Sequence, residues 1–321
     1  MVKGIKMTEQ KLVKFTRLLK KKHSELRIWA KSNGISCYRV YNKDMGDLPF
    51  SIDIYDKYLH IVQYEQKGVA SLSQRDALRL ADAAGKSLYF PEDRIFLKYR
   101  TKLNEGEQYQ KYSAENITAV IQEFGLNFKV NLSDYIDTGL FLDHRDTRAL
   151  VRQNAAGRKV LNLFSYTGSF SVYAAAGGAV STTTVDLSNV YLNWAKENME
   201  LNHFKSAAHT FVSSDVFKYL DEAISQKEKY DLIVLDPPTF SNSRKMDKKL
   251  DIQKDHVELI NKSLKLLSKR GFILFSTNYT DFKIDLKVRD RGFVTNITDE
   301  TIPDDFKGSK IHKCWHIEKR K

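Results

Sequence analysis

The spacing of apolar residues changes twice along the chain and so divides it into three segments. In the first segment, apolar residues recur at helical intervals: Leu12, Phe15, Leu19, Leu26 and Trp29. This spacing places them on one face of a helix, which the pair Asn33-Gly34 then ends. We therefore expect residues 1–34 to form an amino-terminal helix with one apolar stripe and otherwise basic faces.

The second segment, residues 35–127, has the pattern of a small α+β domain. Apolar and polar residues alternate over Phe50 to Tyr55 and, after a tight Asp56-Lys57 connection, a second strand follows over Tyr58 to Tyr64, which predicts a β-hairpin. The later elements expected are a helix over 74–84, strands over 94–99 and 117–123, and a loop over 100–112. Strands around a single helix predict an α+β accessory domain, for which we expect a role in RNA binding.

The third segment, residues 128–321, alternates apolar strands with helices. The strand candidates are 160–164, 181–185, 209–212, 232–235 and 272–276. Nearly continuous apolar strands separated by helices predict a parallel sheet covered on both faces. The fold class is therefore α/β, a Rossmann-like doubly wound sheet, and a ligand is expected at the carboxyl ends of its strands.

The charge of the chain is concentrated near its amino terminus. The 321 residues carry a formal net charge of +12, and the first 31 hold ten basic residues against Glu9 and Glu25. Such a block attracts a polyanion, and RNA is the partner that we expect, with Lys14, Lys20 and Lys21 as contacts to phosphate. A solvated helix face without a partner remains the alternative.

Cysteine content and hydropathy exclude several classes of protein. The two cysteines, Cys37 and Cys314, cannot form a disulfide framework and are too few for a Cys-rich zinc site. No stretch of about 18 apolar residues occurs, so no contact with a membrane is expected and the protein should be cytoplasmic. His312, Cys314 and His316 alternate on one predicted strand, which we interpret as a half-buried final strand and not as a metal site.

Three of the predicted strand ends carry polar residues suited to a nucleoside. After the first strand, the run Asn162 to Gly168 holds one glycine and lacks the G-x-G-x-x-G spacing, which favours an adenosine-type ligand over a dinucleotide, although an ordinary strand-to-helix turn remains open. Asp186 ends the second strand, where a carboxylate can accept both ribose hydroxyls. Asp215 ends the third and can reach an adenine amino group. Helix capping by Asp186, Ser188 or Asp215 is the alternative.

The fourth strand ends in Asp236-Pro237-Pro238-Thr239-Phe240, the most specific motif of the chain. Two prolines after a buried strand cannot continue a ladder and hold the backbone extended. We expect this turn to present the Asp236 carboxylate, the Pro237 carbonyl and the Phe240 ring to a substrate, with a flat base stacked on the ring. A purely structural turn is the alternative.

Together these motifs resemble the class I S-adenosylmethionine-dependent methyltransferases. The longer runs Tyr135 to Arg145, Asn162 to Gly168 and Asp236 to Ser243 resemble, more specifically, the 23S rRNA guanine-N7 methyltransferases that form the carboxy-terminal half of the bifunctional RlmKL enzymes. The resemblance extends from about Cys37 to Trp315. A more distant one links the chain to cytosine-C5 23S rRNA methyltransferases that have a similar accessory domain.

The resemblance implies a set of site residues and a cofactor, S-adenosylmethionine. The residues implied to bind it are Asp143, Arg145, Asn162, Phe164, Ser165, Tyr166, Thr167, Gly168, Asp186, Leu187, Ser188, Asp215, Asp236 and Pro237. Asp236, Pro237 and Phe240 are implied to face the reacting centre, and Asp143 and Arg145 to lie beside the cofactor or a phosphate. The bifunctional enzymes also carry an upstream RNA-binding domain and a second methyltransferase, and this sequence shows neither. Either a separate partner replaces them on 23S rRNA or a ribosome-assembly intermediate, or the rRNA target has to be reconsidered.

The chemistry of the acceptor atom favours guanine N7. Methylation of cytosine C5 requires a cysteine thiolate that adds to the ring, and neither cysteine is close in sequence to a strand end. Guanine N7 has an in-plane lone pair and loses no proton, so that alignment suffices. The remaining alternatives are methylation of cytosine C5 or of a guanine exocyclic amine, and a non-catalytic RNA-binding assembly factor.

Overall fold

The computed structural model describes residues 7–65, 72–100, 113–241, 249–289 and 292–320. The described chain forms two compact units, Met1–Leu142 and Asp143–Lys321. Most of the expected loop over 100–112 lies outside the described residues. Among the described helices, none combines the length and the apolar character that crossing a membrane requires.

The first unit is built on a four-stranded sheet in the order β1-β2-β3-β4. Strands β1 (Cys37–Asn42), β2 (Phe50–Tyr55) and β3 (Tyr58–Tyr64) are antiparallel neighbours, and β4 (Ile95–Arg100) pairs parallel to β3. Helix α2 (Gln74–Leu88) provides the connection that the parallel pair needs. The predicted hairpin of β2 and β3 is confirmed.

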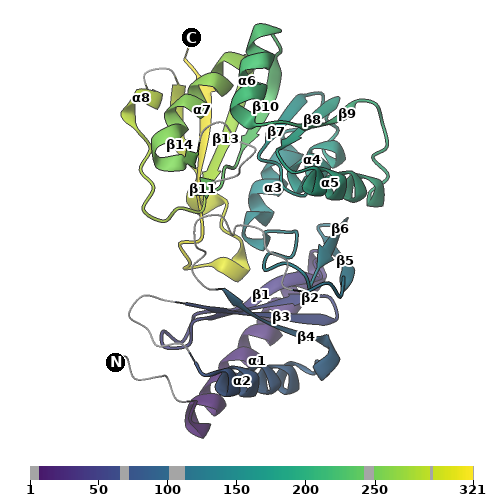
Figure 1. Ribbon diagram of the computed structural model, residues 1–321, viewed down its shortest axis with the longest axis vertical. Coiled ribbons are helices and arrows are strands. Elements are labelled where there is room, and N and C mark those ends of the chain that lie inside the picture. Colours follow the sequence, from purple (N-terminus) through teal and green to yellow (C-terminus); the bar gives the residue numbers. More distant parts are fainter. Residues whose placement is uncertain (1–6, 66–71, 101–112, 242–248, 290–291, 321) are drawn as a thin grey trace. The chain divides into compact units, whose positions relative to one another are not determined.

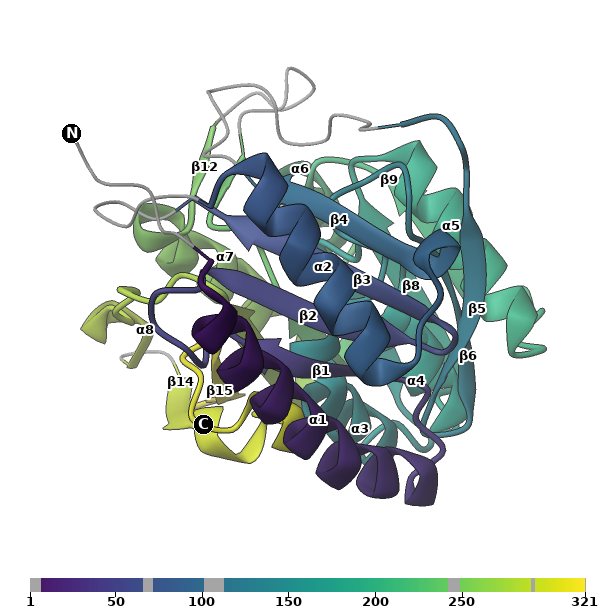
Figure 2. The same cartoon turned by 90° about the horizontal axis from the view of Figure 1, so that it is seen from below.

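Helix α1 (Glu9–Ser32) is the expected basic helix, and it belongs to the first unit. The side chain of Thr8 accepts the backbone N–H of Lys11 at its start, and Asn33 caps its end. Phe15 and Leu19 are buried, and the Phe15 ring contacts Tyr41 of β1 edge-on. Figure 2 shows α1 and α2 next to each other across one face of the sheet.

The boundary between the units lies after Leu142, later than the predicted junction at residues 127 and 128. That junction falls inside a hairpin, because β5 (Thr118–Glu123) pairs with β6 (Leu126–Asn131). The hairpin is bonded to the first unit: the Ser36 backbone N–H donates to the Gln122 carbonyl at 2.8 Å, and the Gln122 N–H donates to the Ser36 hydroxyl at 2.7 Å. Residues 128–142 therefore belong to the accessory unit.

The second unit is a seven-stranded sheet in the order β14-β15-β13-β10-β7-β8-β9 (Figure 1). Its five parallel strands are the five predicted ones: β7 (Lys159–Leu163), β8 (Ser181–Asp186), β9 (His209–Ser213), β10 (Tyr230–Leu235) and β13 (Leu267–Thr277). Strands β15 (Lys313–Lys319) and β14 (Gly292–Asn296) extend the edge in antiparallel fashion. A short β11 (Phe240–Ser241) pairs with β12 (Leu250–Asp251).

Helices cover both faces of this sheet, as a doubly wound fold requires. They are α3 (Arg145–Gln153), α4 (Ser169–Ala176), α5 (Asn189–Leu201), α6 (Val216–Ser225), α7 (Ile252–Leu266) and the short α8 (Leu286–Arg289). Alternate residues of β10 enter separate cores: Leu232 and Val234 pack with α3 and α4, while Ile233 and Leu235 pack with α6 and α7. Because successive side chains of a strand point to opposite faces, the apolar run of β10 supplies both cores. The predicted fold class is confirmed.

Candidate active site

The polar strand ends singled out in the sequence gather at one edge of the sheet. Strands β10, β7, β8 and β9 are consecutive neighbours and parallel, so their carboxyl ends lie side by side. Asp186 is the last residue of β8. The other polar groups follow the strand ends: Asp236 after β10, the loop that begins at Phe164 after β7, and Asp215 after β9. This edge is where a doubly wound sheet binds its ligand.

The loop after β7 is held in a costly backbone conformation. Phe164, Tyr166 and Gly168 all have positive φ, at 55°, 48° and 73°. A side chain at Gly168 would place its Cβ 2.6 Å from that of Ala195, so that only glycine fits. Each non-glycine residue in this region costs about 1–3 kcal/mol, and such cost concentrates at ligand sites. The arrangement therefore exceeds what an ordinary strand-to-helix turn requires.

The same loop offers a buried hydroxyl to a ligand. Among the described residues, Ser165 Oγ has no hydrogen-bond partner although it is buried, whereas its backbone N–H donates to the Val185 carbonyl at 3.0 Å. A buried polar atom without a partner costs about 1–3 kcal/mol unless a ligand or water completes it. Asn162 is directed elsewhere, since its amide donates to Ser171 Oγ at 3.0 Å inside the sheet–α4 packing.

Asp186 shapes the loop as well as facing the ligand edge. Its two oxygens accept the backbone N–H groups of Tyr166 and Ser188, each at 2.9 Å. Burial raises the pKa of Asp186 from its ordinary value of 3.8. Ser188 caps α5 by accepting the Tyr191 N–H, so the helix cap is Ser188 and Asp186 is not needed for it. A carboxylate oxygen has a second lone pair, which leaves Asp186 able to accept a ribose hydroxyl.

Asp215 is the N-cap of α6. One of its oxygens accepts the backbone N–H of Phe217 at 2.8 Å and that of Lys218 at 3.3 Å. The capping interpretation of Asp215 is thus confirmed, and a contact of its second oxygen with an adenine amino group stays a prediction.

The Asp236 carboxylate is hydrogen-bonded to the neighbouring strand β13 and lies close to an adjacent helix turn. Ser276, at the end of β13, donates its hydroxyl to Asp236 Oδ1 at 2.6 Å. His144 Nε2 lies 3.6 Å from Asp236 Oδ2. The Asp236 side chain is 24% exposed, so it is held in place but still open to a substrate.

The aromatic ring that follows the two prolines is available for stacking. Phe240 is 52% exposed, and the centre of its ring lies 6.4 Å from that of Tyr279. Thr239 donates its hydroxyl to the Asn278 side chain at 2.6 Å and so ties the turn to the segment after β13. The sequence pattern did not identify Tyr279 as a site residue, because only the sheet order brings the ends of β10 and β13 together.

Arg145 does not fit the role predicted for it. Its guanidinium donates to Asp305 Oδ1 at 2.6 Å, and both side chains are fully buried. A buried guanidinium with a carboxylate partner is not open to a phosphate or a cofactor, and breaking such a pair is strongly destabilising. We therefore assign Arg145 to the packing beneath the site.

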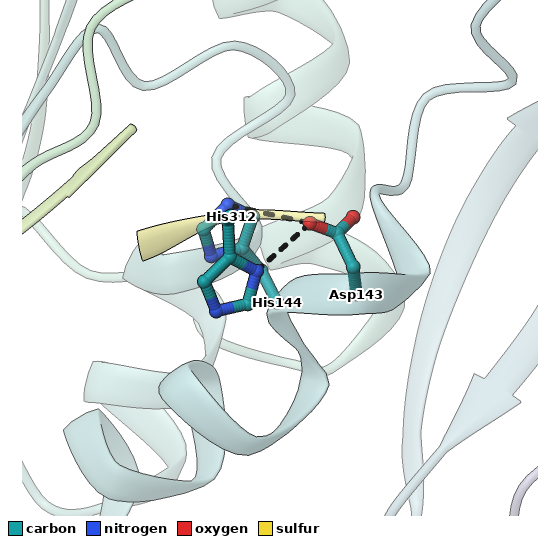
Figure 3. Close-up of side chains that lie close together, drawn as sticks. All are labelled: Asp143, His144 and His312. Carbon is teal, nitrogen blue, oxygen red and sulfur yellow. Dashed lines mark hydrogen bonds and ion pairs between the residues drawn. The ribbon is translucent and has the colours of Figure 1, made fainter. Parts of the chain in front are cut away.

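A cluster of Asp143, His144 and His312 lies beside Asp236, and sequence reasoning missed it as a unit. Figure 3 shows both imidazole rings directed at one oxygen of Asp143. That oxygen lies 3.0 Å from His312 Nδ1 and 3.8 Å from His144 Nε2. Residue His312 precedes β15 and is not on it, so the predicted alternation with Cys314 and His316 along one strand begins only at Lys313.

The cluster has the composition of a metal site but not the geometry. The two imidazole rings are stacked, with centres 4.4 Å apart and planes inclined by 10°. A histidine binds a metal along the lone pair that lies in its ring plane. Two stacked and nearly parallel planes share no point close to both rings, so one ion cannot lie in both planes. In the cluster, His312 is therefore hydrogen-bonded to Asp143, and His144 is stacked on the ring of His312.

Comparison with known proteins agrees with this site. A family model of S-adenosylmethionine-dependent methyltransferases matches residues 91–291. The crystal structure of SMU.776 complexed with SAH superposes with a TM-score of 0.77 at 26% identity, covering 98% of this chain and 83% of that one. The chain belongs to the S-adenosylmethionine-dependent methyltransferase family, and S-adenosylmethionine is its cofactor. The buried Ser165 hydroxyl, which has no hydrogen-bond partner among the described residues, and the Asp186 carboxylate fit this ligand.

Two relatives within that family have names that state a substrate class. It is 45% identical to "Ribosomal RNA large subunit methyltransferase K" of Neisseria meningitidis, over 94% of this chain and 86% of that protein. It is 43% identical to "Ribosomal RNA large subunit methyltransferase K/L" of Shewanella loihica, over 95% of this chain and 43% of that protein. The chain thus spans less than half of the K/L relative.

Proposed function

We propose that this protein transfers a methyl group to N7 of a guanine in the large-subunit ribosomal RNA. Support for the substrate class comes from the names of the K and K/L relatives. The single observation that favours N7 is the composition of the strand end around Asp236: a fixed carboxylate and an exposed aromatic ring, with no ionisable thiol open to a substrate.

The chain's own residues need only orient the base. When bound, S-adenosylmethionine supplies an electrophilic methyl carbon. Stacking on Phe240 holds an unpaired or flipped guanine, a contact of about 1–3 kcal/mol per base. The Asp236 carboxylate can accept an N–H of that base and stabilise the positive charge that methylation of N7 leaves on it. No proton has to be removed, so a general base is not required.

The position of Cys314 bears directly on cytosine C5 as the alternative acceptor. The fold brings Cys314 next to the site, because it pairs with Ser276 across β13 and β15. Yet the thiol is fully buried, and burial together with the charge of Asp236 raises its pKa well above its ordinary value. Since only the thiolate adds to a pyrimidine, a buried thiol of raised pKa is a poor nucleophile.

Removing both thiols is expected to leave methyl transfer within about tenfold of the parent rate. The variant is Cys37→Ser with Cys314→Ala, because alanine keeps the apolar packing at Cys314. A covalent thiolate mechanism would instead lose several orders of magnitude. The measurement is the rate of methyl transfer at saturating cofactor, with cofactor affinity as the control for folding. A collapse of the rate with unchanged affinity would favour cytosine C5.

The acceptor atom is decided by nucleoside analysis. Large-subunit RNA from a strain lacking the gene is incubated with the protein and S-adenosylmethionine, digested, and examined by chromatography with mass spectrometry. The expected product is 7-methylguanosine, whose fixed positive charge also makes the RNA chain cleavable at that site. Appearance of 5-methylcytidine or N2-methylguanosine would overturn the N7 assignment, and absence of any new methyl group would favour a non-catalytic assembly factor.

The exposed face of α1 is the proposed contact to RNA. Lys14, Lys20 and Lys21 are exposed, whereas Lys11 and Lys22 form ion pairs with Asp47 and Asp44 of the same unit. The structure therefore separates lysines that hold α1 in place from lysines that face solvent. Only the second group is free to replace counterions on a phosphate backbone.

Changing Lys14, Lys20 and Lys21 to Gln is expected to flatten the salt dependence of RNA binding. Each phosphate contact contributes about 0.7–0.9 to the slope of log affinity against log salt concentration, so the triple variant should lose about two units. The matched control replaces Lys227, Lys269 and Lys287, which are exposed on the other unit. Equal slopes for the parent and the α1 variant would mean that this face is only solvated.

A separate partner stays a proposal. The K/L relatives are more than twice as long as the part that this chain matches. We propose that a separate protein, which delivers RNA, does for this chain what the additional segments do in those relatives. Recovery of one protein that raises the rate of methyl transfer on intact large-subunit RNA would support it.

A further inference from the structure

We infer that His144 is a positioning residue for methyl transfer, which faces the Asp236 carboxylate with the Nε2–H of a neutral imidazole and donates it to that carboxylate when the substrate is bound. This role rests on methyl transfer at the Asp236 strand end, as proposed above, but not on which base atom accepts the methyl group. It concerns a residue whose side chain is buried, so that it acts on the substrate through Asp236.

The position of the His144 ring nitrogen carries the inference. Nε2 lies 3.6 Å from Asp236 Oδ2 and 3.8 Å from Asp143 Oδ2, between two carboxylates. Both distances are longer than a hydrogen bond, and polar contacts at a catalytic site often shorten to one only when the substrate is bound. The other oxygen of Asp236 accepts the Ser276 hydroxyl at 2.6 Å. Ser276 and His144 thus lie next to different oxygens of Asp236, which restricts rotation of the carboxylate.

The second ring nitrogen identifies the tautomer. His144 Nδ1 is buried and has no hydrogen-bond partner among the described residues. A proton there would be a buried donor without an acceptor, and moving the single proton from Nε2 to Nδ1 would also leave a lone pair facing two carboxylates. The arrangement therefore favours a neutral ring with its proton on Nε2.

The groups around His144 favour the same protonation state. Burial lowers the pKa of His144 from its ordinary value of 6.5; Asp236 and Asp143 act to raise it, and His312 and Arg148 act to lower it. Burial is the largest of these influences. The ring is thus neutral at pH 7 although two carboxylates lie close to it.

Neighbouring rings keep His144 from turning away. The ring of His312 stacks on it with centres 4.4 Å apart, and Phe170 of α4 contacts it edge-on at 5.8 Å. His312 is itself held, since its Nδ1 lies 3.0 Å from Asp143 Oδ2 and its Nε2 lies 3.1 Å from Thr301 Oγ1. The orientation of Nε2 toward Asp236 is therefore built into the packing.

Two variants separate the Nε2–H donor from the shape of the ring. His144→Phe keeps a stacked ring without a donor, and His144→Gln places an amide N–H near the position of Nε2. We expect His144→Phe to lower kcat about 10–100-fold with cofactor affinity within about twofold, because a misdirected group costs orientation and not binding. His144→Gln should recover most of that loss.

The pH dependence adds a readout that a purely structural role would not change. Protonation of His144 keeps its Nε2–H but adds a positive charge beside Asp236, which offsets the negative charge that stabilises the methylated base. Because burial lowers the pKa of His144 from its ordinary value of 6.5, kcat is expected to fall only on the acid side of that value, and this acid limb should be shifted or absent in His144→Gln. An unchanged acid limb in that variant, or full activity of His144→Phe, would overturn the role. Equal loss of cofactor binding in both variants would show a structural role instead.

A spectroscopic test does not depend on activity. Nitrogen-15 NMR of the parent protein, with the His144 signals assigned by comparison with His144→Gln, reports which ring nitrogen carries the proton. The expected result at pH 7 is a neutral ring with its proton on Nε2. An imidazolium, or a proton on Nδ1, would overturn the inference even if the parent transfers no methyl group to ribosomal RNA, an outcome that would contradict the proposed function alone.

Discussion

Replacing Asp236 by Asn is expected to lower kcat for methyl transfer by about two to three orders of magnitude, the size typical of losing one preorganised group that stabilises charge in the transition state. The amide is nearly the same shape as the carboxylate, but it removes the negative charge and one of the acceptors between Ser276 and His144. Cofactor affinity should change much less, because Asp186 and the loop that begins at Phe164 provide separate contacts.

The same strand supplies a matched control for Asp236. Asp231 lies at the opposite end of β10, and it too accepts a serine hydroxyl at 2.6 Å, that of Ser268, as well as the Lys159 backbone N–H. Asp231→Asn should therefore lower the free energy of unfolding without a comparable change in kcat. Steady-state rates and thermal unfolding of the two variants decide the matter: if Asp236→Asn turned over at the parent rate, Asp236 would have no part in the reaction.

The second large effect is expected at Asp186. Asp186→Ala should weaken the binding of S-adenosylmethionine by about 2–4 kcal/mol, because hydrogen bonds of a buried carboxylate to ribose hydroxyls are charge-assisted. Part of this loss has a different origin, since the carboxylate also holds the backbone N–H groups of Tyr166 and Ser188 and with them the loop after β7. Calorimetry on the purified variant measures the affinity directly.

Asp186→Asn separates the two contributions. The amide keeps one oxygen acceptor for the loop but loses the charge, so its affinity should lie between those of the parent and the alanine variant. Burial raises the pKa of Asp186, and the parent should accordingly begin to lose cofactor affinity at a higher pH on acidification than an exposed aspartate would. Unchanged affinity in a folded Asp186→Ala protein would remove this residue from the cofactor site.

Local pattern was sufficient to predict the framework of the second unit. The apolar runs of β7, β10 and β13 are readable because strands buried on both faces need nearly continuous apolar residues. Strands β8 and β9 hold fewer apolar residues, and their prediction depended on the alternation of strands with helices. The sequence also shows the roles of Gly168 and of the two prolines after Asp236. Glycine permits a positive φ and proline fixes φ, whatever residues surround them. These constraints act over a few residues, and a sequence displays them directly.

What only the tertiary structure decided is which side chains meet across long distances in the chain. His144 and His312 stack although the whole parallel sheet lies between them in sequence, and Cys314 lies beside the site yet is too buried to react. Arg145 forms a buried ion pair with Asp305. The boundary between the units lies after the β5–β6 hairpin, because that hairpin is hydrogen-bonded to Ser36. Each outcome depends on strand order and on competition for burial among distant segments, which no local periodicity encodes.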